Sequence, residues 1–291
     1  MSQKILISGQ FGQVSRELQQ RLGALGELHV LGRDQLDLAQ PEGIREVVRR
    51  LRPTLIINAA AHTAVDQAET EEDLAFAING IAPGIFAEEA AALDIPLIHY
   101  STDYVFDGRK EGAYHEDDEP NPLGVYGRSK LQGERAVRAV DGKHLILRTS
   151  WVYSLHGRNF LLTMQRLLQE KPELRVVADQ IGAPTWAGTI AGTSQALVEH
   201  WLAGQARPWG TYHLTAKGET SWFGFAQEIG KHLLAQDKPC ATLEPIPSSA
   251  YPTPAVRPLN SRLDCSRLEQ QWNVHLPNWR EALIECLAPL A

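Results

Sequence analysis

Tyr126 and Lys130 lie four residues apart in the chain. On a helix, this spacing places the phenol and the ammonium on the same face, one turn apart. A free tyrosine has a pKa of about 10, and a nearby cation favours its ionised form. The pair is therefore suited to exchange a proton near neutral pH, as general acid–base catalysis requires. The same spacing also occurs on solvated helix faces, so the rest of the chain must decide.

The amino end predicts a dinucleotide-binding turn. An apolar run at 4–8 is typical of a buried parallel strand, and 16–25 has leucines at helical spacing. Gly9 and Gly12 stand between them. Gly9 would allow a tight turn, and Gly12 would let backbone N–H groups approach a pyrophosphate at the positive end of the helix. A strand, a glycine turn and a helix in this order open a nucleotide-binding unit, with an ordinary turn as the alternative.

Length and composition narrow the class of protein. The chain has 291 residues, enough for a nucleotide-binding domain and a smaller lobe. Its net charge of −7 argues against general nucleic-acid binding. Three widely spaced cysteines predict free thiols in a reducing compartment, and no apolar run reaches the roughly 18 residues of a membrane span. We expect a cytoplasmic protein without nucleic-acid or membrane partners. The acidic run at 116–119 predicts a solvated loop, and no metal site is expected there.

Strands and helices alternate along the first half. This alternation predicts an α/β fold with a Rossmann-type, doubly wound parallel sheet and a smaller C-terminal substrate-binding lobe. The expected strands are 4–8, 28–31, 54–59, 96–101 and 144–149, and the expected helices between them are 41–51, 71–93 and 123–140. Pro83 is expected to interrupt the second of these helices and to kink it.

The second half has a looser pattern. Helices are expected near 160–169, 187–202 and 223–235, followed by many prolines between 239 and 258. We predict a dinucleotide-binding domain at 1–150 and a substrate-binding lobe made mainly of 151–291. The absence of a sharp linker predicts that the two parts interleave.

Arg33 bears on the choice of nicotinamide cofactor. An acid at the end of the second strand normally binds the ribose of NAD, whereas an arginine suits the 2′-phosphate of NADP. Here Gly32 and Arg33 follow the strand, and a guanidinium matches phosphate geometry. This favours NADPH. Asp34 and Asp37 leave NADH open, and a plain surface charge is the alternative for Arg33.

Longer motifs make a resemblance specific. The sequence resembles the extended short-chain dehydrogenase/reductases and, within them, the dTDP-4-dehydrorhamnose reductase family. The matching segments follow the order of that family over nearly the whole chain: 9–18, 58–66, 99–106, 126–130, 148–153, 179–185 and 251–263. The resemblance implies reduction of the C4 ketone of dTDP-4-dehydro-L-rhamnose to dTDP-L-rhamnose by NADPH, with Tyr126 as proton donor.

The resemblance also implies the residues of the site. Tyr126, Lys130 and Thr102 would be the catalytic residues, with Lys130 holding the ribose hydroxyls and biasing the Tyr126 pKa. The cofactor would be bound at Gly9, Gly12, Gln13, Val14, Arg33, Asp37, Leu38, Ala61, His62, Thr63 and Tyr100, as well as by Tyr126 and Lys130. Val65, Thr102, Asp103 and Trp151 would contact the sugar. A hydrogen-bonded histidine at a helix start is the alternative for His62, and a core position is the alternative for Trp151.

A nucleotide-sugar substrate also carries a diphosphate, so a cationic clamp is needed. Arg257 and Arg262 stand in a proline-stiffened segment and are the candidates, with surface salt bridges as the alternative. Some members of the family form a dimer bridged by magnesium through glutamates. Glu17 matches one such position, but Gly188 stands where another glutamate is expected. Magnesium is therefore uncertain and a homodimer stays open.

Other functions remain open at this level. A nucleotide-sugar dehydratase or epimerase would share the fold, but dehydratases typically carry a glutamate after the Thr-Asp pair, where this chain has Tyr104. A non-catalytic regulatory subunit, like that of methionine adenosyltransferase, would also share the fold. Reduction of a different 4-keto sugar nucleotide is the third alternative.

Overall fold

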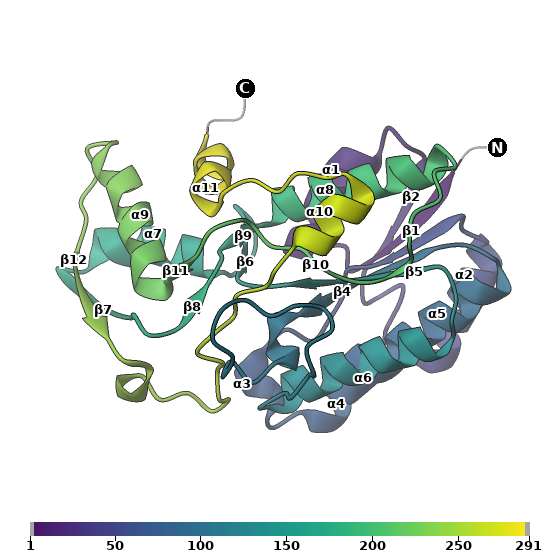
Figure 1. The fold of residues 1–291 in the computed structure, drawn as a ribbon, viewed down its shortest axis with the longest axis horizontal. Coiled ribbons are helices and arrows are strands. Elements are labelled where there is room, and N and C mark those ends of the chain that lie inside the picture. Colours follow the sequence, from purple (N-terminus) through teal and green to yellow (C-terminus); the bar gives the residue numbers. More distant parts are fainter. Residues whose placement is uncertain (1–2, 289–291) are drawn as a thin grey trace.

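The computed structural model describes residues 3–288, and a six-stranded parallel sheet lies at its centre (Figure 1). The strands run in the order β10-β5-β4-β3-β1-β2. Their bounds are β1 Lys4–Ser8, β2 Glu27–Leu31, β3 Leu55–Asn58, β4 Leu97–Thr102, β5 His144–Thr149 and β10 Gly210–His213. The order reverses direction beside β1, as in a doubly wound sheet. The predicted Rossmann-type fold and its first five strands are confirmed.

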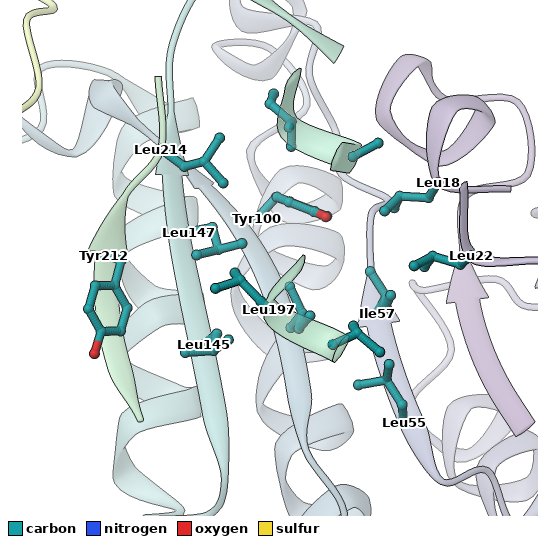
Figure 2. Close-up of a cluster of buried hydrophobic side chains, with 14 of the residues drawn as sticks. Leu18, Leu22, Leu55, Ile57, Tyr100, Leu145, Leu147, Leu197, Tyr212 and Leu214 are labelled. Atoms are coloured by element: carbon teal, nitrogen blue, oxygen red, sulfur yellow. The ribbon is translucent and has the colours of Figure 1, made fainter. Parts of the chain in front are cut away.

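Helices cover both faces of this sheet, which explains why its strands read as continuous apolar runs. One face is covered by α1 (Gln13–Leu22), α8 (Ala187–Leu202) and α10 (Ser266–Trp272), and the other by α2 (Pro41–Leu51), α5 (Ala82–Ala92) and α6 (Val125–Ala139) (Figure 1). Successive side chains of a strand point to opposite faces. Leu145 and Leu147 accordingly join the first core, which Figure 2 shows with Leu18 and Leu197, whereas Ile146 joins the second.

The helix expected over 71–93 is interrupted, as predicted, and the interruption lies just before Pro83. It consists of α4 (Glu72–Phe76), a π-helical turn at Ala77–Ile81, and α5, which has Pro83 in its first turn. Proline cannot donate to a carbonyl four residues back, and its ring crowds that carbonyl. The wider π turn accommodates the ring and frees the Asn79 carbonyl, which faces Gly133 of α6.

A second group of elements forms the smaller lobe beside the sheet, at the left of Figure 1. Its helices are α7 (Phe160–Glu170), α9 (Trp222–Leu234) and α11 (Trp279–Leu287), packed around a separate apolar core with the parallel pair β7 (Glu173–Val177) and β12 (Thr242–Ile246). Two short pairs connect the lobe to the sheet region: β6 (Val152–Tyr153) with β9 (Thr185–Trp186), and β8 (Ile181–Gly182) with β11 (Thr220–Ser221).

The three helices expected in the second half are confirmed as α7, α8 and α9. The chain also returns to the sheet, because β10, α8 and α10 come from beyond residue 150. The division at residue 150 stays a prediction. Among residues 3–288, no helix is both long enough and apolar enough to cross a bilayer.

Candidate active site

A cavity of about 760 Å³ opens where the sheet strands end. Gly9 follows β1, Ala59 follows β3, Thr102 closes β4 and Thr149 closes β5, and all four line the cavity. The carboxyl ends of parallel strands beside a reversal of strand order form the usual ligand crevice of such sheets. The first turns of α1 and α6 complete the wall through Gln13 and other residues of the two helices.

The glycine turn has the backbone that a dinucleotide requires. Gly9 has a φ of +91°, which a side chain rarely adopts, and a Cβ there would approach the Ala60 Cβ to 3.0 Å. Gly12 caps α1 without any side-chain hydrogen bond to the helix. The first N–H groups of α1 are therefore available to an anionic ligand, at the positive end of the helix dipole. These residues fit the pyrophosphate of a dinucleotide.

Tyr126 and Lys130 lie one turn apart at the start of α6, as predicted, and both line the cavity together with Thr102. Burial raises the pKa of Tyr126 to about 12, and the neighbouring Thr102 hydroxyl only partly opposes this rise. Burial lowers the pKa of Lys130 to about 8, against the attraction of Glu134. The net pKa of Tyr126 is thus raised rather than lowered, and the influence of Lys130 on it stays a prediction. A raised pKa keeps Tyr126 as a protonated phenol, the form that donates a proton.

Asp103 is the acidic residue of the cavity wall. Its carboxylate is 3% exposed, one oxygen accepts from the Thr102 hydroxyl at 3.1 Å, and Oδ2 has no partner among the described residues. Burial raises the pKa of Asp103 to about 6. The hydrogen bond from Thr102 and a contact with Ser261 oppose this rise only in part.

Trp151 forms a wall of the cavity and has an unusual backbone for its size, with a φ of +49°. Its indole stacks on Trp222 of α9, with ring centroids 3.6 Å apart and planes at 12°. Gly182 lies against the same indole, because a Cβ there would come within 2.7 Å of it. The Trp222 indole N–H donates to Gln180 at 3.1 Å. Residues of the smaller lobe therefore fix this wall.

Most of the predicted site residues lie together in the wall of the cavity. They are Gly9, Gly12, Gln13, Val14, Arg33, Ala61, Thr63, Val65, Tyr100, Thr102, Asp103, Tyr126, Lys130 and Trp151.

Three predicted cofactor residues lie outside that wall. Asp37 accepts a hydrogen bond from the Ala39 N–H at 3.0 Å and so closes its own turn, while Leu38 packs in the core beneath α2. His62 turns its Nε2 towards Glu71, 3.0 Å away. Local hydrogen bonds and packing explain the position of each side chain, and a role of these three residues in cofactor binding stays a prediction.

The two arginines predicted to clamp a diphosphate are also engaged elsewhere. Arg257 donates to both carboxylate oxygens of Asp66, at 3.0 and 2.9 Å. Arg262 donates to Asn260 at 2.9 Å and to Glu219 at 3.1 Å. Neither lines the cavity. The salt-bridge alternative holds for both in the ligand-free chain, because each guanidinium finds a carboxylate next to it.

The sequence analysis missed the loop between β6 and α7. Gly157, Arg158 and Asn159 line the cavity beside Gln13, which follows the glycine turn. Gln13 fastens this loop, because its Oε1 accepts from the Asn159 amide at 2.8 Å and from the Ser154 hydroxyl at 3.0 Å. Arg158 is exposed and has no ion pair among the described residues. A polar turn between a strand and a helix has no sequence feature that predicts a place in a binding site, and only the fold reveals it.

Comparison with known proteins agrees with this site. The family model for the RmlD substrate binding domain matches residues 3–291. A dTDP-4-dehydrorhamnose reductase of Burkholderia thailandensis is 45% identical over 99% of both chains, and one of Escherichia coli K12 is 44% identical over 95% of this chain and 94% of that protein. The chain belongs to the dTDP-4-dehydrorhamnose reductase family. The expected enzyme class, an oxidoreductase, is thereby confirmed.

Solved structures give the same family. The dTDP-4-dehydrorhamnose reductase of Bacillus anthracis, determined in complex with NADP, has a TM-score of 0.91 and 34% identity, covering 98% of this chain and 99% of that one. A UDP-glucose 4-epimerase of Thermus thermophilus has a TM-score of 0.74 at 19% identity over 92% of this chain and 93% of that one, which shows a shared fold alone. Within residues 3–288, no group of three or more His, Cys, Asp or Glu side chains is arranged to hold a metal ion.

Proposed function

We propose that this reductase-family chain converts dTDP-4-dehydro-L-rhamnose to dTDP-L-rhamnose with NADPH. The observation that carries the proposal is that one cavity is lined by both the glycine turn and the acid–base group of Tyr126, Lys130 and Thr102. A cofactor seated on the turn and a ketone beside Tyr126 would share a single cavity. A cytoplasmic location is part of the proposal.

Each of the proposed site residues has a separate role in ketone reduction. NADPH supplies the hydride, and the protein supplies position and proton. Tyr126 donates its proton to the carbonyl oxygen as negative charge develops there. The Thr102 hydroxyl, once it turns from Asp103, contributes a second donor to the same oxygen. Lys130 offsets the charge left on the phenolate. Asp103 and Trp151, both in the cavity wall, contact the sugar.

The diphosphate groups need cations, and Arg158 is the strongest candidate. Arg158 lines the cavity on the loop that is hydrogen-bonded to Gln13, the first residue of α1. We expect Arg158→Ala to weaken binding of NADPH or of the sugar nucleotide by about tenfold, the loss of one charge-assisted hydrogen bond. Titration with each ligand alone distinguishes the two, and Arg166→Ala, an exposed arginine on α7 paired with Glu170, is the control. Unchanged affinity for both ligands would exclude Arg158.

One assay tests the reaction itself. The protein is mixed with NADPH and the 4-keto sugar nucleotide, loss of NADPH absorbance is followed, and the product is identified by mass spectrometry and NMR. Binding of NADPH without turnover would favour a regulatory subunit, and turnover of another 4-keto sugar at a higher kcat/KM would change the substrate. Dehydratase or epimerase activity would appear as product without net NADPH consumption.

Arg33 lines the cavity and is proposed to select NADPH over NADH. Its guanidinium would contact the 2′-phosphate that only NADPH carries. Arg33→Ala should lower kcat/KM for NADPH by about tenfold and leave that for NADH nearly unchanged. If the ratio of kcat/KM for NADPH to that for NADH were unchanged, Arg33 would not select the cofactor.

A further inference from the structure

A buried row of polar side chains runs beneath the cavity to Lys130. Ser8, Asn58 and His99 lie at paired positions on the neighbouring strands β1, β3 and β4, and each is at most 1% exposed. The residues two positions earlier on the same strands are Leu6, Ile56 and Leu97, all in the apolar core under α5. The carboxyl ends of these strands are therefore polar, whereas the preceding position on the same face of each strand is apolar. A buried polar group lowers the stability of the fold unless it is hydrogen-bonded.

The row is continuous. Ser8 Oγ donates to Asn58 Oδ1 at 2.7 Å, Asn58 Nδ2 lies 3.1 Å from His99 Nδ1, and His99 Nε2 lies 3.4 Å from Lys130 Nζ. The Ala60 N–H, next to the glycine turn, donates to Ser8 Oγ at 3.3 Å. The row thus connects the cofactor turn to the lysine of the proposed catalytic group.

We infer that His99 is a positioning residue for Lys130, accepting a hydrogen bond from the Nζ ammonium through Nε2. The inference rests on the proposed function, which gives Lys130 its catalytic role. Lys130 Nζ also donates to the Tyr100 carbonyl at 2.6 Å. With two of its three N–H groups held by β4, the third points to the cavity that Lys130 lines.

The donor and acceptor roles along the row follow from the charge of Lys130. An ammonium at Lys130 requires a lone pair on His99 Nε2, so the imidazole proton resides on Nδ1. Asn58 must then present its oxygen to Nδ1 and its amide nitrogen to Ser8, a half-turn of the amide that exchanges two ends of nearly equal shape. Burial and the neighbouring Lys130 keep the pKa of His99 well below its usual value, so the imidazole is neutral and can accept.

The groups facing Lys130 define what a pH measurement would report. They are His99 and Tyr100 from β4, and Tyr126 and Glu134 from α6. The Glu134 carboxylate accepts two hydrogen bonds from Arg148, at 2.7 and 2.9 Å, so the negative charge that faces Lys130 is partly neutralised. His99 is the neutral acceptor in this set. Loss of its Nε2 lone pair would make the ammonium less stable and lower the pKa of Lys130.

Two polar variants of similar size test the inference. In His99→Gln the side-chain amide reaches the place of Nε2 and keeps an acceptor for Lys130, whereas in His99→Asn it reaches only the place of Nδ1 and keeps the Asn58 contact. We expect His99→Asn to move the alkaline fall of kcat to lower pH by about one unit, the worth of one hydrogen bond to a charged group. His99→Gln should keep the wild-type profile, and both should bind NADPH with similar affinity.

A second measurement keeps this test separate from the proposed reaction. NMR of lysine labelled with ¹³C at Cε, assigned with Lys130→Met, reports the ionisation of Lys130 without turnover. A lower Lys130 pKa in His99→Asn but not in His99→Gln supports the inference, even if the wild type reduces another substrate. Equal Lys130 pKa values in the two variants, or equal shifts in both, would overturn it.

Discussion

At the scale of single residues, the site places Tyr126, a phenol with a raised pKa, beside Lys130, an ammonium with a lowered pKa. Replacing Tyr126 by phenylalanine removes the proton donor and leaves the shape of the cavity. Turnover should fall by roughly 10²–10⁴-fold, while NADPH affinity should change little. Tyr104→Phe is a matched control, since Tyr104 lines the same cavity and packs edge-on against Tyr126 at 5.4 Å. Turnover of Tyr126→Phe near the wild-type rate would contradict the assignment.

Asp103 makes a residue-scale prediction about stability. Burial raises the pKa of its carboxyl from an ordinary 3.8 to about 6, so the folded chain binds its proton more tightly than the unfolded chain. The protein is therefore more stable at a pH below the carboxyl pKa of the unfolded chain. This part of the free energy of unfolding is lost as the pH rises through about 6, the pKa in the folded chain. At neutral pH the site therefore carries a destabilising buried charge.

Asp103→Asn keeps an acceptor for Thr102 and removes that charge. We expect it to raise the free energy of unfolding by about 1–3 kcal/mol at neutral pH, with the gain disappearing in acid, and to weaken sugar binding. Denaturant titrations at several pH values measure this. A gain that is constant with pH would mean that the carboxylate charge is not its cause.

At the scale of elements, the contact between the π-helical turn and α6 positions the acid–base pair. The Asn79 side chain accepts from the His62 N–H at 2.9 Å and donates to Ser129 Oγ at 3.1 Å, so this turn ties the loop after β3 to the helix that carries Tyr126. Gly133 permits the approach, because a Cβ there would overlap the Asn79 carbonyl.

Gly133→Ala should therefore destabilise the protein by about 1–3 kcal/mol, even though alanine favours helix. Gly43→Ala in α2 is the matched control, since a Cβ there meets only the Gln40 Cβ at 3.7 Å. It should stabilise by about 0.5–1 kcal/mol. Urea midpoints compare the two, and the same sign of change in both would refute the steric explanation.

At the scale of the whole molecule, the smaller lobe completes the cavity. Trp222 of α9 supports Trp151 by stacking, so the substrate wall depends on the packing of the lobe against the sheet region. Trp222→Leu should raise KM for the sugar nucleotide about three- to tenfold, the worth of one aromatic stack, and leave NADPH affinity unchanged. Trp222→Phe retains an aromatic face and should be closer to wild type. An equal loss of NADPH affinity would point to general unfolding instead.

The sequence by itself determined the architecture and most of the residues that line the cavity. Apolar runs, helical spacing and two glycines are local signals, so the five predicted strands, the glycine turn and the Tyr126–Lys130 face could be read without coordinates. Strand ends meet at one edge of a parallel sheet, which explains why Thr102 and Asp103 also fell in the right place.

Only the tertiary structure decided which charges are free and which are paired. Arg257 and Arg262 looked suited to a diphosphate, but their carboxylate partners lie 191 and 43 positions away in the chain, where no local pattern reveals them. Arg158 became a candidate because the fold brings its loop to Gln13 and to the wall of the cavity. The pKa of Tyr126 is raised rather than lowered for the same reason, since burial is a property of the packed molecule and not of residue spacing.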